Sequence, residues 1–264
     1  MRGDSPVRYS VLCSSSTPRH DRWGRMKRGA GLMEHKPKRQ TAKRIAEAAL
    51  QLFNCFGEPG ITVAAIAADA GISPGNLHYH YPTKEKIVED LFAGFEDEIE
   101  PTLAAPELRP AHAEDLWLFL HLTFEIVFKY RFLYRDLNEL LSTHRIIETQ
   151  FRDILAKQVQ TASALLNGLA ESDALHASKA ECQALAESMI MIATYWLSYE
   201  FVLHPRRQPD NATLTRGIVS ALSLANPYLV PDARALFEHL SQAYLDSEGE
   251  EHASQAAEME KLSG

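Results

Sequence analysis

The sequence predicts an all-α protein with two folded parts: a three-helix head that contains a helix-turn-helix, and a larger C-terminal helical bundle. Two observations predict this class. Apolar residues recur at helical spacing across residues 111–246, and no segment there alternates polar and apolar side chains as a half-buried strand does. Earlier in the chain, residues 61–84 contain two short helical segments separated by a glycine. We therefore expect the head to lie N-terminal to the bundle.

The chain is expected to divide into four segments. Residues 1–38 lack a hydrophobic period and are rich in Ser, Arg, Gly and Pro, so we expect a disordered basic arm. Residues 39–100 form the head, and prolines mark the break before the body at residues 101–246. The acidic residues 247–264 are expected to form a flexible tail.

Two amphipathic helices frame the head. The first is expected at residues 41–57, and the last at residues 84–99, where it connects the head to the body. Because their apolar residues return every three or four positions, one face of each helix is expected to be buried. The buried residues are Ile45, Ala49, Leu52, Phe53 and Phe56 in the first helix and Ile87, Leu91, Phe95 and Ile99 in the last.

The first helix of the central pair is expected at residues 63–70. Thr62 is a good N-cap, because its hydroxyl can accept a hydrogen bond from the first turn. Gly71 can adopt the left-handed conformation that ends a helix without strain. The apolar face of this helix consists of Val63, Ile66, Ala67 and Ala70.

The second helix of the pair is expected at residues 74–81, with Ser73 as its N-cap and Pro74 in its first turn. Leu77 points back to the first helix. A helix of two turns contributes little core, and simple packing does not explain a run of two histidines and two tyrosines on it. We interpret the pair as a helix-turn-helix whose second helix enters the DNA major groove. The residues left on its outer side are Gly75, Asn76, His78 and His80.

The head resembles the DNA-binding domain of the TetR family of bacterial transcriptional regulators. The resemblance covers residues 41–95, roughly a fifth of the chain. At two positions the sequence departs from the family's usual pattern: His78 stands where tyrosine is common, and Asn76 where serine or threonine is common. Both are expected to change the base preference and not the fold. The motifs are the amphipathic helix Ala42–Phe56, Gly60-Ile61-Thr62-Val63, Ile66-Ala67, Ala70-Gly71-Ile72-Ser73, the block Gly75-Asn76-Leu77-His78-Tyr79-His80-Tyr81, and Thr83-Lys84-Glu85.

The resemblance implies roles for individual residues. Thr62 and Lys84 are expected to contact phosphates, and Gly75 to let the backbone approach DNA closely. Tyr79 is expected to pack on a phosphate or hydrogen-bond to it. The side chains that face base edges or nearby phosphates are Asn76, His78 and His80, and asparagine can pair bidentately with adenine. The full expected DNA-binding set is Thr62, Ser73, Pro74, Gly75, Asn76, His78, Tyr79, His80 and Lys84.

The resemblance also implies that the body binds a small effector between its helices and dimerises through its last long helices. The segment 178–203 is apolar on all its faces, so a second copy is expected to cover part of it, together with 211–225. The protein is then expected to be a repressor that binds a palindromic double-stranded DNA operator as a homodimer. The helices expected in the body are 111–131, 133–142, 144–170, 178–203, 211–225 and 231–246.

An aromatic-rich stretch with interspersed cations, Arg131 and Arg135 among them, lies between residues 117 and 135. Such a mixture is typical of a mostly apolar pocket with a few orienting polar groups, although aromatic residues at helical spacing also occur in plain cores. The effector, whose identity the sequence does not give, is expected to be small and largely apolar. The residues expected to line its pocket are Trp117, His121, Phe124, Phe128, Arg135, Tyr195 and Tyr199.

Charge is distributed unevenly along the chain. The net charge is −8, yet residues 1–44 carry twelve Lys or Arg against three Asp or Glu. The positive segment therefore adjoins the helix-turn-helix, which suits binding to a polyanion. The arm either lies along DNA or precedes the natural start of the protein, since Met26 and Met33 are both possible first residues.

Other function classes find little support. Three scattered cysteines, Cys13, Cys55 and Cys182, argue for a reducing compartment and against a disulfide framework or a zinc finger. No segment approaches the roughly 20 apolar residues that cross a membrane, and the N-terminus lacks the apolar region of a signal peptide. We expect a cytoplasmic, nucleoid-associated protein without a membrane partner.

We expect no enzyme. His78 and His80 are two residues apart, so they point to different sides of a helix and do not chelate one metal. No catalytic triad, phosphate-binding loop or His-Glu-x-x-His motif is present, and neither a metal nor a cofactor is expected. The alternative function is a helix-turn-helix regulator or architectural DNA binder that has no small-molecule ligand and is controlled by a protein partner.

Overall fold

The computed structural model describes residues 36–104, 109, 111–240 and 242. The chain forms two compact units, residues 1–93 and 94–264, which we call the head and the body and describe separately. The expected basic arm up to residue 35 and the expected acidic tail, residues 247–264, lie outside the described residues. In the part of the chain that the structure describes, regular structure is helical apart from one isolated bridge between Leu175 and Leu229.

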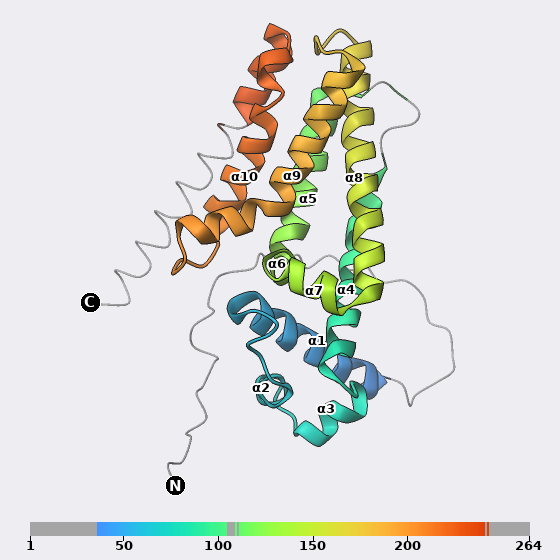
Figure 1. The fold of residues 1–264 in the computed structure, drawn as a ribbon, viewed down its shortest axis with the longest axis vertical. Helices are drawn as coiled ribbons and strands as arrows, with labels where there is room; N and C mark the ends of the chain where they lie inside the picture. Colours follow the sequence, from blue (N-terminus) through green and yellow to red (C-terminus); the bar gives the residue numbers. More distant parts are fainter. Residues whose placement is uncertain (1–35, 105–108, 110, 241, 243–264) are drawn as a thin grey trace, which may run out of the picture. The chain divides into compact units, whose positions relative to one another are not determined.

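The head consists of α1 (Lys36–Phe56), α2 (Val63–Asp69), α3 (Pro74–His80) and the first part of α4 (Lys84–Ile99) (Figure 1). Helix α1 begins five residues earlier than the sequence analysis predicted. The reason is that Pro37 stands in its first turn, where a missing N–H leaves no hydrogen bond unmade. Residues predicted to be buried in α1, α2, α3 and α4 form the core of the head: Ile45, Ala49, Leu52, Phe53, Ile66, Ala67, Leu77, Ile87 and Leu91. Phe56 is only partly buried.

The boundary between the units falls inside α4 and not at the prolines after residue 100, where we expected it. Helix α4 is continuous to Ile99, but its last residues pack in the body. Phe95 stacks on Phe151 with ring centroids 6.1 Å apart and meets Tyr130 edge-on at 5.8 Å. Packing, rather than the end of the helix, therefore decides where the body begins.

The body is a bundle of long helices (Figure 1). Residues 133–142, expected as one helix, are divided between α6 and α7 because Asp136 adopts the non-helical angles φ −102° and ψ 19°. No helix in the described segments is both long and apolar enough to span a bilayer. The elements are η2 (Glu100–Leu103), α5 (Ala113–Lys129), α6 (Arg131–Arg135), α7 (Leu137–Thr143), α8 (Arg145–Glu171), α9 (Lys179–Leu203), α10 (Asn211–Ser223) and η3 (Asn226–Tyr228), followed by helical residues 231–240.

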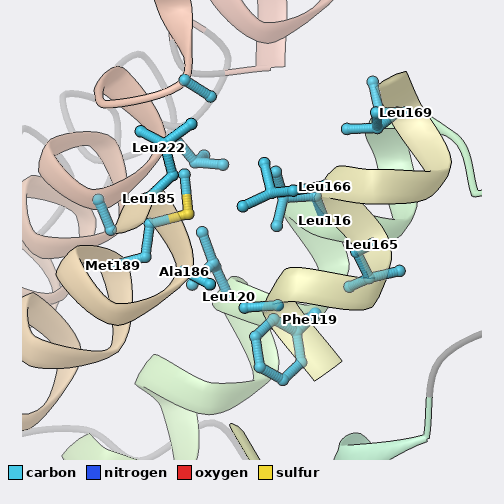
Figure 2. Packing of buried hydrophobic residues seen from close by; sticks show 14 of the residues in the cluster. Leu116, Phe119, Leu120, Leu165, Leu166, Leu169, Leu185, Ala186, Met189 and Leu222 are labelled. Atoms are coloured by element: carbon cyan, nitrogen blue, oxygen red, sulfur yellow. The ribbon is translucent and has the colours of Figure 1, made fainter. Parts of the chain in front are cut away.

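The main core of the body lies where four helices meet. Helix α9 packs against α8 on one side and α10 on the other, and α5 contacts all three. Figure 2 shows leucines of α5 and α8 facing the apolar side chains of α9 and α10. The labelled residues of this cluster are Leu116, Phe119, Leu120, Leu165, Leu166, Leu169, Leu185, Ala186, Met189 and Leu222.

A glycine allows α10 to approach α5 and α9 closely. A Cβ atom added to Gly217 would lie 2.4 Å from Phe124 Cε1 and 2.8 Å from Trp196 Cδ1. Beside it, the Trp196 indole Nε1–H donates a hydrogen bond of 2.7 Å to the Thr213 carbonyl. The two aromatic rings fill the space that any larger residue at position 217 would need.

We predict that Gly217→Ala destabilises the protein. Overpacking a filled site typically costs about 1–3 kcal/mol, which exceeds the gain of about 1 kcal/mol from the better helix propensity of alanine. The measurement is the urea midpoint of unfolding. Gly75→Ala is the matched control, because nothing lies within 4 Å of its added Cβ. An unchanged midpoint for Gly217→Ala would show that the two rings can move apart freely.

Candidate nucleic-acid interface

Side-chain caps hold the two short helices of the helix-turn-helix. Thr62 Oγ1 accepts a hydrogen bond of 3.2 Å from the Ala65 N–H, and Ser73 Oγ accepts one of 3.2 Å from the Asn76 N–H. Between the helices, Gly71 has a φ of +65°, in the left-handed region that glycine adopts without strain. The caps and turn predicted from the sequence are confirmed.

An arginine of α1 fastens the turn. Arg44 Nη2 donates a hydrogen bond of 2.5 Å to the carbonyl oxygen of Ala70, the C-cap residue of α2. The last carbonyls of a helix have no partner within it, so an external donor stabilises the helix end. The sequence analysis missed this role because Arg44 lies 26 residues away from Ala70.

Helix α3 presents the side that the sequence predicted. Leu77 is fully buried against the head, whereas Pro74, Gly75, Asn76 and His78 are exposed. Tyr79 is the most exposed of the aromatic residues, at 68%. His80 is only partly exposed, so its access to a partner is narrower than expected.

The exposed rings on α3 have defined neighbours. His78 Nδ1 lies 3.2 Å from the Pro82 carbonyl oxygen, and since a carbonyl only accepts, Nδ1 carries the proton of this bond. Tyr79 meets His80 edge-on with centroids 5.4 Å apart, and Lys38 Nζ lies 4.6 Å from the centre of the Tyr79 ring.

A basic hollow adjoins α3. It is formed by Lys38, Arg39 and Ala42 of α1 together with His80 and Tyr81, and its volume is about 340 Å³. The sequence analysis placed Lys38 in a disordered arm, but here it belongs to a helix in contact with the exposed face of α3. The first turns of α1 therefore add positive charge to the side of the head where α3 displays its polar residues.

Tyr81 anchors the end of α3. Its hydroxyl donates a hydrogen bond of 2.6 Å to Asp90 Oδ2 on α4. Burial, and then the hydrogen bond to the Asp90 carboxylate, raise the pKa of the Tyr81 hydroxyl well above its usual value. The hydroxyl thus remains a donor at neutral pH and links α3 to α4.

Lys84 is engaged inside the head. Its Nζ atom lies 3.0 Å from the Glu58 carbonyl oxygen, 3.2 Å from the Ile61 carbonyl oxygen and 2.9 Å from Glu58 Oε1. An ammonium group has three N–H donors, so all of them are used within the head. In this conformation Lys84 fastens the loop between α1 and α2 to the start of α4, and its expected phosphate contact stays a prediction.

The expected effector pocket is only partly assembled in the body. A cavity of about 10 Å³ lies between α5, α9 and α10. It has space for about one water molecule. Phe124 and Phe128 line it, as expected. The other lining residues are Val127, Trp196, Leu197 and Leu214.

The remaining pocket residues predicted from the sequence lie elsewhere. Trp117 stacks on His121 with centroids 5.0 Å apart, and Arg135 pairs with Asp136 at 3.4 Å. Tyr195 and Tyr199 are 50% and 55% exposed. Helix α9 is apolar on all faces, so its periodicity does not show that Trp196, and not Tyr195 or Tyr199, faces this cavity.

One face of α9 is apolar and exposed. Met191, Tyr195, Tyr199 and Val202 are each at least half exposed, and their spacing of three or four residues places them on one side of the helix. The buried Glu200 carboxylate is paired with Arg216 of α10 at 2.8 Å. Leu185 and Met189, on another face of the same helix, belong to the core of the body.

Comparisons with known proteins agree with this architecture. A model described as bacterial regulatory proteins, tetR family, matches residues 45–91, and a model described as bacterial transcriptional repressor, TetR, matches residues 94–237. The second match alone covers more than half of the chain. A search of curated proteins gave no match.

Several solved structures share the fold. A TetR-family transcriptional regulator from Marinobacter aquaeolei VT8 is 29% identical, with a TM-score of 0.69 over 77% of this chain and 98% of that chain. A TetR transcription regulator from Haloarcula marismortui is 18% identical, with a TM-score of 0.53 over 73% and 100%. A γ-butyrolactone receptor described as ArpA-like is 16% identical, with a TM-score of 0.55 over 80% and 99%.

The family assignment follows from the two units together. The head has a capped helix-turn-helix with an exposed second helix, and the body matches the family model along most of its length. The family consists of DNA-binding regulators and not of enzymes. The protein belongs to the TetR family of bacterial transcriptional regulators.

Proposed function

We propose that the protein is a ligand-responsive repressor that binds a roughly palindromic operator as a homodimer and is released by a small, largely apolar effector. The observation that carries the proposal is α3: a rigidly capped helix whose polar and aromatic side chains are exposed instead of packed. A side chain that reads the major groove needs both a fixed backbone and an exposed functional group. Each subunit would place α3 in one half-site.

The proposed division of roles follows exposure and chemistry. Asn76 and His78 would contact base edges, since both tips are exposed and one can pair with adenine. Gly75 leaves room for a close approach, because no atom outside its own helix backbone lies within 4 Å of where a Cβ would stand. Tyr79, Lys38 and the neighbouring Arg39 would contact phosphates. Thr62, Ser73 and Pro74 would position the helix ends, and His80 would act at the edge of the basic hollow.

The exposed apolar face of α9 supports the proposal of a homodimer. A contiguous apolar face on a helix is typical of an interaction surface. We propose that it pairs with the same face of a second copy, with α10 beside it. Helix α4 connects each head to its body, so an effector that prefers one body conformation would change the separation of the two heads. A hundredfold change in DNA affinity requires about 2.7 kcal/mol of coupling.

One observation favours the alternative, a DNA binder that takes no ligand. The cavity in the body holds about one water, so an effector of ordinary size requires the helices around it to move. The two functions differ in what DNA-bound protein does when small molecules are added. Release from the operator by a small apolar compound supports the ligand-responsive regulator, and control only by a protein supports the alternative.

The test of the proposed function is a selection of genomic DNA fragments by the purified protein. We predict a shared motif with two inverted half-sites. In Asn76→Ala the preference at one position of each half-site should be lost, since a bidentate base contact discriminates by about 1–3 kcal/mol. Gln51→Ala, on the exposed side of α1, is the control. A motif without inverted symmetry would argue against the dimeric mode, and an unaltered motif in Asn76→Ala would remove this residue from base contact.

Two lysines of the head are predicted to behave differently. Lys38→Gln should lower the slope of log Kd against log salt by about 0.9, the value for one phosphate contact, without changing stability. Lys84→Met should lower the free energy of unfolding by about 1–3 kcal/mol, because the Glu58 and Ile61 carbonyls lose their donor. The measurements are binding titrations at several salt concentrations and urea unfolding. A reduced salt slope with normal stability in Lys84→Met would restore it as a phosphate contact.

The α9 face gives a prediction on assembly. Tyr195→Glu combined with Val202→Glu should convert the dimer to a monomer of 29.6 kDa, because two carboxylates would be buried in the interface. Light scattering after size exclusion measures the mass. Ile146→Glu, at a 59% exposed position on α8, is the control and should remain dimeric. A wild-type monomer at micromolar concentration would contradict the proposed interface.

A further inference from the structure

Arg131, at the start of α6, is a partly buried cation whose Nε atom is fully buried. This Nε atom makes no hydrogen bond, and Nη1 donates a long hydrogen bond of 3.4 Å to the Phe128 carbonyl oxygen. Among the described residues no carboxylate forms an ion pair with it. Four other arginines of the body each form an ion pair with a carboxylate: Arg109 with Asp115, Arg135 with Asp136, Arg207 with Asp210 and Arg216 with Glu200.

The surroundings of Arg131 disfavour its charge. Burial, and then the positive charge of Arg135, lower the pKa of the Arg131 guanidinium. A desolvated charge that lacks a partner destabilises a fold, and proteins rarely keep one without a use for it. An anion placed against the free donors would remove both penalties.

Arg131 adjoins the cavity of the body through a shared residue. Its guanidinium carbon lies 5.2 Å from the centre of the Phe128 ring, and Phe128 lines the cavity. A second buried polar atom without a partner, Thr123 Oγ1, belongs to α5 one turn before Val127, which also lines the cavity. Apolar lining and unused polar atoms therefore occur together on the same stretch of α5 and α6.

We infer that the effector is an amphipathic carboxylate, whose apolar part opens the cavity beside Phe128 and whose carboxylate pairs with Arg131. Guanidinium and carboxylate match in geometry and form charge-assisted hydrogen bonds. This inference rests on the proposed ligand-responsive function and specifies the chemical class of the ligand. Because the free protein leaves the buried Nε of this partly buried cation without a partner, the ligand supplies the missing charge and favours the conformation that holds it.

The test uses two probes that differ only in the head group: 4-phenylbutyrate and 4-phenylbutan-1-ol. Calorimetry on the full-length protein should show that the acid binds at least about tenfold more tightly than the alcohol, as expected for one charge-assisted interaction. In Arg131→Met the preference for the acid should disappear, while the affinity for the alcohol stays the same. Equal affinities in the wild type, a preference that persists in Arg131→Met, or no binding of either probe at millimolar concentration would overturn the inference.

Controls separate a binding role from a structural one. Arg145→Met removes a cation whose side chain is 93% exposed on α8, and it should keep the preference for the acid. In the absence of ligand, Arg131→Met should melt no earlier than the wild type, because it removes a partly buried charge that has no ion pair. Should it melt early, Arg131→Lys replaces it in the titration: it keeps a charge without the planar fork and should retain part of the preference.

Operator binding is measured on the same preparations. Arg131→Met should bind the selected operator as the wild type does, since the residue lies in the body. Normal DNA binding together with failure of the calorimetric test would overturn the ligand class alone. Failure of the wild type to select any DNA motif would instead overturn the proposed function.

Discussion

The head depends on satisfying the backbone groups at the ends of helices that are too short to be stable alone. Each of α2 and α3 has seven residues, so most of their N–H and C=O groups lack partners within the helix. Thr62 and Ser73 supply acceptors at the N-termini, and Arg44 supplies a donor at the end of α2. Lys84 donates hydrogen bonds to two backbone carbonyls of the loop before α2. Two cations of a DNA-binding head are thus used to hold its geometry.

This use of side chains explains how a small helix can present its tips so freely. Only Leu77 of α3 is fully buried, and Tyr81 follows it with a hydrogen bond to α4. The remaining side chains of α3 are available to a partner, because the backbone is held by caps and not by their packing. Rigid backbone and free side chains are what positioned recognition requires.

The body follows the opposite rule, in which close packing leaves little free volume. Gly217 brings α10 against Phe124 and Trp196, and the buried Glu200 is neutralised by Arg216. Nearly every buried polar group in the described part of the body has a partner. Thr123 Oγ1 and Arg131 Nε are the exceptions, and Arg131 contacts Phe128, which lines the cavity. A buried polar atom without a partner in an otherwise satisfied interior calls for an explanation, and a bound ligand is the one that we propose.

The sequence by itself determined the elements whose signals are local. The N-caps Thr62 and Ser73, the glycine turn and the exposed side of α3 follow from residues within a few positions of each other. The tertiary structure alone decided which residues pair across long separations. Lys84 meets a loop up to 26 residues away, so its engagement is not visible in local spacing. The sequence likewise does not show which side of α9 faces the cavity. A helix that is apolar on all faces has no hydrophobic periodicity to identify its buried side, so the neighbouring helices decide it.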